Sequence, residues 1–159
     1  MTQLLELHET KVIEQWVDSF GHMNLANYVA VCDQSTFAFW ELVNVNTKQD
    51  QRGGAEYAVV ETHVNYLREV RLGDTLKVTT QLLGADEKRF RLFHNMINTA
   101  DDSIAATNEV MGLGFDLNTR NLSTFTPQVQ KRMQDLLKQH SQLPVPGNAG
   151  RCIAMGVKK

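Results

Sequence analysis

The stretch Asn24–Val43, NLANYVAVCDQSTFAFWELV, decides the fold of this 159-residue chain. It contains no Gly or Pro, and its apolar residues recur at helical spacing in two adjacent rows. One row is Leu25, Val29, Cys32, Thr36, Phe39 and Val43, and the other is Tyr28, Val31, Ala38 and Leu42. Asn24 suits an N-cap because its side chain can accept a hydrogen bond from the next turn. The sequence therefore predicts one long, mostly buried helix.

Segments that alternate between polar and apolar residues follow this helix after the Gly53-Gly54 break and predict β-strands. Turn residues separate them at roughly hairpin spacing, which indicates an antiparallel meander. The predicted strands are Ala58–Tyr66, Leu76–Leu82, Phe90–Ile97 and Ile104–Leu117. A further strand is predicted ahead of the helix, at Thr10–Trp16, where the alternation is less regular.

A second, amphipathic helix is predicted at Pro127–His140, with Pro at its start and Val129, Met133 and Leu136 on one side. One apolar helix and one sheet indicate an α+β fold. In that fold an antiparallel five-stranded sheet wraps around the long central helix. We expect residues 1–126 to form one domain, to which the additional C-terminal helix and tail at 127–159 also belong.

The composition limits the kinds of molecule that this chain is expected to bind. The chain has 16 Lys and Arg against 18 Asp and Glu, a formal net charge of −2, and no dense basic run. This argues against non-specific binding to nucleic acid or to an anionic membrane. Glu6 interrupts the short apolar start, so neither a signal peptide nor a membrane span is expected. Cys32 and Cys152 form no metal-ligand cluster, which fits a reducing cytoplasm.

The loop before the helix, Asp18-Ser-Phe-Gly-His-Met-Asn24, joins a carboxylate, a flexible glycine and a helix N-terminus. Such a terminus presents free N–H groups and partial positive charge, which suits an oxygen that becomes negative during acyl transfer. One such donor is worth about 3 kcal/mol in the transition state. Asp18 could attack a carbonyl or take a proton from water. An Asp at this position is more often a cap or turn residue, so the loop pattern leaves both roles open.

Two motifs carry a resemblance to a known family. The first is Asp18-x-x-Gly21-His22-x-Asn24, followed by Tyr28 and the long helix, and the second is Val64-Asn-Tyr-Leu-Arg-Glu-Val-Arg-Leu-Gly-Asp74. Over about residues 7–118 the chain resembles the 4-hydroxybenzoyl-CoA thioesterase family of hotdog-fold proteins. The resemblance implies hydrolysis of an acyl-CoA thioester by a homodimer or larger oligomer whose active sites lie between subunits.

Carried over residue by residue, the resemblance places the catalytic carboxylate on Asp18 and the loop glycine on Gly21. The oxyanion donor falls on the backbone N–H near Leu25, directly after Asn24. His22 could position water or the thioester, although a loop histidine can equally hydrogen-bond to the backbone. The run Asn24-Leu-Ala-Asn27-Tyr28 keeps part of the family's pattern, which implies that Asn27 and Tyr28 contact the substrate.

Polar side chains around the second motif are further candidates for substrate binding. His63 and Asn65 lie on the polar face of their strand and in a hotdog dimer could border the partner's Asp18, whereas an exposed polar face needs no function. Arg68 and Arg71 could meet the phosphates of coenzyme A, because Arg binds phosphate bidentately, or they are ordinary surface charges. The same two roles, phosphate binding or ordinary surface charge, are open for Lys88, Arg89 and Arg91.

The tail Leu143–Arg151, LPVPGNAGR, together with Glu109-Val-Met in the last strand, looks somewhat like thioesterases linked to carnitine and betaine breakdown. That likeness implies an acyl group with a quaternary ammonium. Aromatic faces such as Trp16, Phe37 or Trp40 could hold it by cation–π attraction of about 1 to 2 kcal/mol. Core packing is the alternative role of those rings.

Other chemistry is less well supported. Asp33 and Glu41 lie on the long helix, where some related thioesterases place their carboxylate, but Asp18 already fills that role. Cys32 lies on the apolar row without a neighbouring base, so we expect a core residue. The sequence has no GxSxG, GxxxxGK[ST] or GxGxxG motif, which disfavours a serine hydrolase and nucleotide chemistry.

The sequence therefore predicts a cytoplasmic acyl-CoA thioesterase that hydrolyses a small or medium acyl-CoA thioester as a homodimer or homotetramer. Asp18 would act as general base or nucleophile, the start of the long helix would bind the oxyanion, and no metal or other cofactor would be needed. Betainyl-CoA is one candidate substrate. The alternatives are a hotdog hydratase or dehydratase and a non-catalytic module that binds acyl-CoA.

Overall fold

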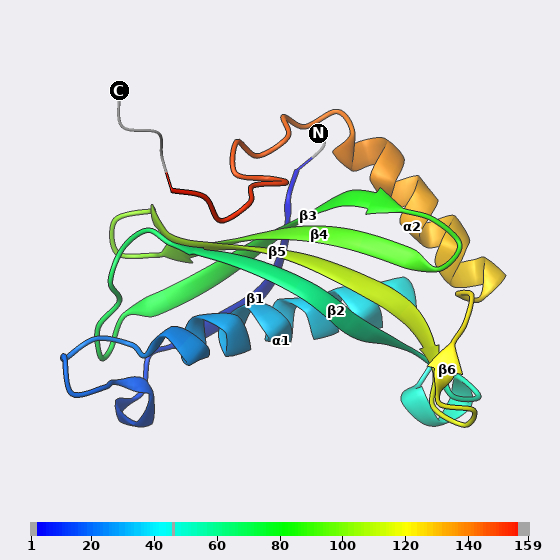
Figure 1. The fold of residues 1–159 in the computed structure, drawn as a ribbon, viewed down its shortest axis with the longest axis horizontal. Coiled ribbons are helices and arrows are strands. Elements are labelled where there is room, and N and C mark those ends of the chain that lie inside the picture. The colour runs from blue at the N-terminus through cyan, green and yellow to red at the C-terminus, as the bar shows by residue number, and fades with distance from the viewer. Residues whose placement is uncertain (1–2, 46, 156–159) are drawn as a thin grey trace.

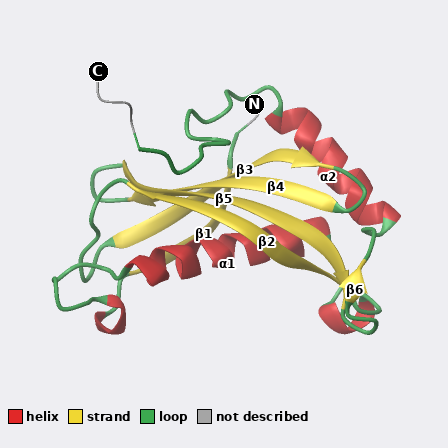
Figure 2. Cartoon of the chain, in the orientation of Figure 1, coloured by secondary structure: helices red, strands yellow, loops and turns green. Residues whose placement is uncertain are grey.

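The computed structural model describes residues 3–45 and 47–155, which form a curled antiparallel sheet packed against one long helix (Figure 1). Helix α1 spans Leu25–Val43 and lies along one face of the sheet, and helix α2 spans Pro127–His140. The segment after α2 runs over the opposite face (Figure 2). The predicted α+β fold, a five-stranded antiparallel sheet around a long helix with an additional C-terminal helix, is confirmed.

Five main strands pair in the spatial order β1-β3-β4-β5-β2, all antiparallel, and a two-residue strand β6 pairs with β5. Their bounds are Leu5–Lys11 for β1, Ala55–Tyr66 for β2, Thr75–Ala85 for β3, Arg89–Asn98 for β4, Ser103–Asp116 for β5 and Asn121–Leu122 for β6. Strands β3, β4 and β5 form the predicted meander, but β2 lies at the far edge beside β5. The prediction of a four-strand meander is therefore wrong at β2.

The connection between β2 and β3 explains this error. It runs through Leu67–Asp74 and is too long for a tight hairpin, so it can cross to the other edge of the sheet. Along the way Val70 is fully buried, and its carbonyl accepts a 2.7 Å hydrogen bond from the N–H of Met23. The connection between β2 and β3 therefore passes next to the loop that precedes α1.

The first strand also differs from the prediction at Thr10–Trp16. Strand β1 starts at Leu5 and ends at Lys11, because its partner β3 begins at Thr75, opposite Lys11. Beyond that point Glu14–Trp16 forms a short 3₁₀ turn. The carbonyl of Trp16 accepts a 2.8 Å hydrogen bond from the N–H of Asn24, so this segment is bonded to the start of α1 instead of to the sheet.

Helix α1 is buried on one side only, not on most sides as its two apolar rows predict. A single sheet covers one face of a helix, and Leu25, Phe37 and Leu42 remain 63%, 51% and 40% exposed in the single chain. The buried side consists of Tyr28, Val31, Cys32, Ser35, Thr36, Phe39, Trp40 and Val43. An apolar surface on α1 is therefore left uncovered within one chain.

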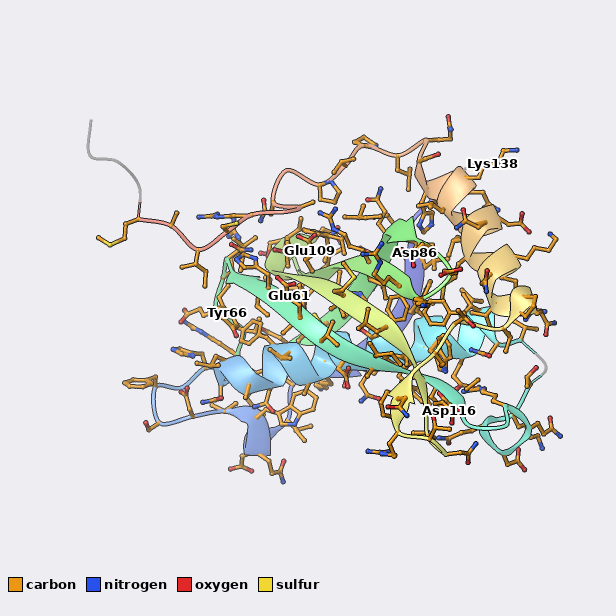
Figure 3. All side chains as sticks on the ribbon, turned by 45° about the vertical axis from the view of Figure 1, so that its right-hand side comes forward. Glu61, Tyr66, Asp86, Glu109, Asp116 and Lys138 are labelled. Carbon is orange, nitrogen blue, oxygen red and sulfur yellow. The ribbon has the colours of Figure 1, made fainter. Side chains whose placement is uncertain are left out.

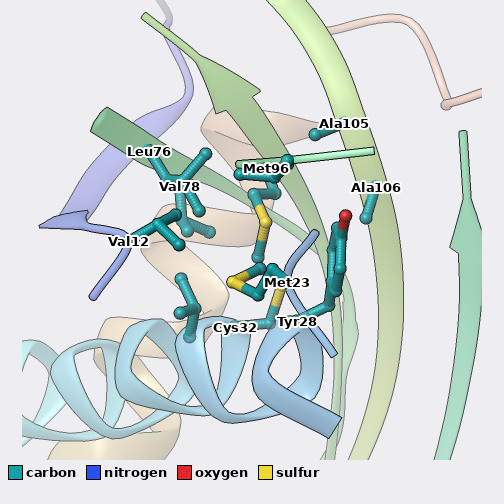
Figure 4. Close-up of a cluster of buried hydrophobic side chains, with 11 residues drawn as sticks. Val12, Met23, Tyr28, Cys32, Leu76, Val78, Met96, Ala105 and Ala106 are labelled. Atoms are coloured by element: carbon teal, nitrogen blue, oxygen red, sulfur yellow. The ribbon is translucent and has the colours of Figure 1, made fainter. Parts of the chain in front are cut away.

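The core falls into two clusters along α1. Around the first half of α1, Cys32 packs with Val12, Met23, Val78 and Met96 (Figure 4). Burial raises the pKa of the Cys32 thiol to about 12, so the thiol is protonated at neutral pH and the expected core role is confirmed. The second cluster, around the other half, contains Phe39, Trp40, Val43, Leu82, Phe90, Leu92, Val110, Phe125, Val129 and Met133.

Helix α2 packs beside β3 and completes the second cluster. The Thr126 side chain caps its start by accepting from the N–H of Val129, and Pro127 follows in the first turn. At the other end, His140 Nδ1 accepts a 2.8 Å hydrogen bond from the N–H of Leu82. Helix α2 is thus joined to the sheet by apolar packing and by a buried hydrogen bond. Within the described ranges, neither α1 nor α2 combines the length and the apolar character that a membrane crossing needs.

Candidate active site

The loop that precedes α1 folds back on itself and brings Asp18 next to His22. The N–H of Asp18 donates to the carbonyl of His22 over 3.1 Å, and the N–H of Gly21 donates to the carbonyl of Asp18 over 3.0 Å. This reversal requires a φ of +83° at Gly21, a conformation that glycine adopts without strain. The carboxylate of Asp18 accepts the N–H of Phe20 at 2.9 Å and lies 4.0 Å from His22 Nδ1. The loop therefore holds a carboxylate and an imidazole side by side.

The start of α1 leaves one backbone donor free. Asn24 is the N-cap, as predicted, and its side chain accepts the N–H of Ala26 at 3.0 Å. The N–H of Asn27 donates to the carbonyl of Asn24. Among the described residues, the N–H of Leu25 finds no acceptor. That group is a donor at the positive end of the helix dipole and is available to a ligand.

A pocket of about 500 Å³ opens at this place, between the loop, the start of α1 and the segment that follows β2. It is lined by the predicted residues Asp18, His22, Asn24, Leu25, Tyr28 and Arg68. All but Arg68 lie within residues 18–28, and the arrangement of α1 beside the end of β2 brings Arg68 to them (Figure 1). The fold thus gathers Asp18, Leu25 with its free N–H, and the candidate Arg68 around one cavity.

Two tyrosines form the inner wall of this pocket. The rings of Tyr28 and Tyr66 meet edge to face with centroids 5.3 Å apart. The Tyr66 hydroxyl donates to the carbonyl of Leu25 at 3.3 Å, and the Tyr28 hydroxyl donates to the carbonyl of Arg68 at 3.2 Å. Burial raises the pKa of both phenols, which keeps them neutral at physiological pH.

Sequence reasoning missed Tyr66 and Phe20 as pocket residues. Tyr66 ends β2 and lies close to the start of α1 (Figure 3), while the Phe20 side chain is 83% exposed at the tip of the loop. The signal for Tyr66 was its place in the second motif, two residues before Arg68. For Phe20 it was an exposed aromatic within the loop that carries Asp18.

Five of the predicted residues do not line this pocket, and one of them, Gly21, serves only the backbone turn of the loop. Asn27 instead donates its side-chain N–H to the carbonyl of Trp16 at 3.2 Å, and Arg71 is exposed and paired with Glu69 at 2.7 Å. His63 and Asn65 hydrogen-bond to each other, and His63 lines a separate cavity beneath the C-terminal segment. Glu61 and Glu109 line that same cavity (Figure 3). Within one chain, the side chains of Asn27, His63, Asn65 and Arg71 are thus not among those that line the Asp18 pocket.

The aromatic candidates for cation–π binding and the remaining basic residues are also outside the pocket. Trp40 is buried among Tyr57, Phe90 and Phe125, as the core-packing alternative expects, and Trp16 is half-buried against the first core cluster. Phe37 remains exposed on α1. The basic side chains Lys88, Arg89 and Arg91 pair with Glu87, Asp86 and Glu109, respectively.

The pocket combines groups that can cleave an acyl bond. Asp18 offers a carboxylate that can attack a carbonyl or accept a proton from water, and the Leu25 N–H can donate to an oxyanion. His22 adds a titratable group within 4.0 Å of that carboxylate. Among residues 3–45 and 47–155, no three His, Cys, Asp or Glu side chains group as metal ligands would.

Comparison with known proteins places this chain among thioesterases. The family model described as thioesterase-like superfamily matches residues 12–133. A betainyl-CoA thioesterase of Pseudomonas aeruginosa is 33% identical over 155 residues, which are 98% of each chain. An L-carnitine dehydrogenase/betainyl-CoA thioesterase of Agrobacterium fabrum is 38% identical over 92% of this chain, but the match spans only 30% of that longer protein.

Solved structures agree with this placement. A Staphylococcus aureus protein determined in complex with CoA superposes with a TM-score of 0.88 and 28% identity over 98% of both chains. A 1,4-dihydroxy-2-naphthoyl-CoA thioesterase from Synechocystis, 15% identical, shares the fold with a TM-score of 0.69 over 81% of this chain and 95% of its own. The resemblance to hotdog thioesterases, including those of carnitine and betaine breakdown, is confirmed. The chain therefore belongs to the thioesterase-like superfamily and is a thioester hydrolase of hotdog fold.

Proposed function

We propose that this hydrolase cleaves a small or medium acyl-CoA thioester in the pocket between the Asp18 loop and the start of α1. The observation that carries the proposal is that the Asp18 carboxylate and the free N–H of Leu25 line one cavity of about 500 Å³. A carbonyl between them would have a nucleophile or base on one side and an oxyanion donor on the other. Neither group requires a cofactor for that step.

The predicted residues of the loop and of the start of α1 have separate roles in this proposal. Asp18 attacks the thioester carbonyl directly or takes a proton from the attacking water. The Leu25 N–H, presented by a helix that Asn24 caps, stabilises the oxyanion. Gly21 permits the turn that aims the carboxylate, and His22 orients the water or the thioester. Tyr28 forms the pocket wall beside the reacting group.

The proposed acyl group is betainyl. The support is the betainyl-CoA thioesterase of Pseudomonas aeruginosa, whose similarity covers 98% of both chains. For the coenzyme A part, Arg68 supplies an exposed guanidinium at the rim of the pocket, which suits a phosphate. Asn27, lying behind the pocket, would act on substrate only through its hydrogen bond to Trp16, as a positioning residue.

We further propose that the chain assembles as a homodimer or homotetramer. Strand β2 ends the sheet with an unpaired edge, and α1 carries uncovered apolar residues such as Leu25 and Phe37. A second copy could cover both and could bring His63, Asn65 or Arg71 near a neighbouring pocket. The cytoplasmic location expected from the sequence belongs to the same proposal.

The test is a panel of CoA esters with short, long, aromatic and betainyl acyl groups, assayed by release of free thiol. Betainyl-CoA should be hydrolysed with the highest kcat/KM of the panel. A higher kcat/KM for another ester would contradict the betainyl assignment. If no ester releases thiol while coenzyme A binds tightly, the binding-module alternative is correct. If enoyl-CoA is hydrated instead, the hydratase alternative is correct.

A further inference from the structure

The pocket between the Asp18 loop and the start of α1 contains accessible aromatic surface that the proposed hydrolysis does not use. Tyr66 and Phe20 both line this pocket, and they are 47% and 83% exposed. Within residues 3–45 and 47–155, the only ring with a cationic side chain over it is that of Phe115, 5.2 Å from the Arg120 guanidinium. The rings of Tyr66 and Phe20 are therefore open to a ligand.

The Tyr66 ring is held in place at both ends. Its backbone ends β2, and its hydroxyl donates to the carbonyl of Leu25 at 3.3 Å. The ring of Tyr28 stands perpendicular to it with centroids 5.3 Å apart, and Tyr28 itself is only 4% exposed. A ring that is already positioned loses little conformational freedom when a ligand binds against it.

The Tyr66 ring lies within reach of a short acyl group at the helix start. A carbonyl oxygen that accepts the Leu25 N–H lies about 3 Å from that nitrogen. In a betainyl group the ammonium nitrogen is two bonds from the carbonyl carbon, about 2.5 Å away. The ammonium is therefore within roughly 7 Å of the Leu25 nitrogen. Since the Tyr66 hydroxyl is bonded to the carbonyl of the same residue, ring and ammonium occupy the same end of the pocket.

The charged groups of the pocket favour a cation over an anion. Asp18 and Glu69 are its acidic lining residues, and Arg68 is its basic one. Glu69 is paired with Arg71 at 2.7 Å. In the part of the chain that the structure describes, the Asp18 carboxylate has only His22 as an ionic neighbour, at 4.0 Å. A positively charged acyl group therefore enters beside a carboxylate that no Lys or Arg of these residues neutralises.

We infer that the Tyr66 ring, with Phe20 as a second aromatic wall, binds a quaternary ammonium of the acyl group beside the scissile carbonyl. Such cations are attracted to the faces of aromatic rings, and a tyrosine face suits a trimethylammonium that has left water. The three aromatic residues that the sequence suggested for this role lie outside the pocket. This inference rests on the proposed function, because that function places the carbonyl at the Leu25 N–H. It assigns substrate choice to Tyr66 and leaves hydrolysis to Asp18.

The test compares betainyl-CoA with 3,3-dimethylbutyryl-CoA, in which a tert-butyl group replaces the trimethylammonium without its charge. In Tyr66→Leu, which removes the ring, kcat/KM for betainyl-CoA should fall at least about tenfold, while kcat/KM for the neutral isostere stays within about threefold. Tyr66→Phe keeps the ring and loses only the hydroxyl bond to Leu25, so it should keep the wild-type preference for betainyl-CoA.

Two further variants sharpen this comparison. Phe20→Leu should lower the betainyl preference in the same direction but less, because that ring is more exposed to water. The matched control is Phe115→Leu, which removes a ring at the end of β5 opposite to the end that pairs with Tyr66. It should leave the ratio of the two kcat/KM values unchanged. An unchanged ratio in Phe20→Leu would remove Phe20 from the site.

The outcomes separate this inference from the proposed function. Equal losses for both esters in Tyr66→Leu would show a structural wall and overturn the cation site. An unchanged ratio in that variant would overturn it as well, while hydrolysis of betainyl-CoA by the wild type would still support the proposed function. Loss of the preference in Tyr66→Phe would assign the effect to the hydroxyl and contradict the role of the ring. A wild type that favours 3,3-dimethylbutyryl-CoA over betainyl-CoA would contradict both the betainyl assignment and the cation site.

Discussion

At the scale of single residues, His94 shows how a polar group is placed in this core. Its ring is fully buried, Nε2 lies 3.0 Å from the Thr36 hydroxyl, and Nδ1 lies 2.9 Å from the Thr80 hydroxyl. Burial lowers the pKa of His94 from 6.5 to about 3. At neutral pH the imidazole is therefore uncharged, and one ring nitrogen donates to its threonine hydroxyl while the other accepts from the second hydroxyl.

This burial predicts an acid sensitivity. The stability contributed by neutral His94 is fully present above pH 6.5, and it is lost as pH falls from 6.5 toward about 3. Over this pH range His94 binds a proton in the unfolded chain but not in the folded chain. Urea unfolding at pH 7 and pH 5 should show the wild type losing about 2 kcal/mol more than His94→Gln. Equal losses in the two proteins would contradict a neutral, buried His94.

Gly114 is required by close backbone packing. A Cβ at this position would lie 2.3 Å from the carbonyl oxygen of Ser123, which is backbone and cannot rotate away. Gly114→Ala should therefore lower the free energy of unfolding by about 1–3 kcal/mol. Gly147→Ala is the control, because a Cβ there meets nothing within 4 Å, and it should change the free energy of unfolding by less than about 0.5 kcal/mol. If urea titrations give the two variants similar free energies of unfolding, Gly114 is not required by close backbone packing.

The Asp18 loop was predictable from the sequence because its residues are adjacent. Asp18, Gly21 and Asn24 lie in one turn and a cap, and local rules for turns and helix starts describe both. Tyr66 joins the same pocket only through the pairing of β2 with β5, a long-range contact. Asn27 is a predicted substrate contact, and in this structure its side-chain amide donates to the carbonyl of Trp16. Local patterns cannot distinguish those two uses of an amide.

At the scale of elements, helices were better predicted than strand neighbours. Helix α1 starts directly after its cap Asn24 and ends at Val43, as its spacing indicates, because no Gly or Pro interrupts it. The position of β2 depended on a crossing connection, and the start of β1 depended on where β3 begins. Neither is encoded in the alternation of a single strand.

Helix α2 should be part of the same folding unit as the sheet, as the proposed single domain requires. Met133 is fully buried in the second core cluster, so Met133→Ala should lower the free energy of unfolding by about 2–5 kcal/mol. The matched control, Met155→Ala, removes a side chain that is 97% exposed and should have almost no effect. Thermal unfolding should remain a single transition. Two separate transitions would mean that α2 folds independently of the sheet.

At the scale of the whole molecule, the chain leaves surfaces that a second copy would cover. Strand β2 has one unpaired edge, and Val59 and Val60 on it are 41% and 54% exposed. An uncovered edge of this kind is a site for further strand pairing. Light scattering at micromolar concentration should give at least twice the mass of one chain. A monomer under these conditions would contradict the proposed oligomer.

The central claim is that the Asp18 carboxylate performs the hydrolysis, and Asp18→Asn tests it most directly. Asn can still accept the N–H of Phe20, so the loop keeps its shape while the negative charge is lost. The matched control is Asp50→Asn, an exposed carboxylate in the turn Gln49–Gln51, which should be fully active. On the best ester of the panel, kcat for Asp18→Asn should fall at least about a hundredfold with coenzyme A binding unchanged. A kcat within about threefold of the wild type would contradict the account.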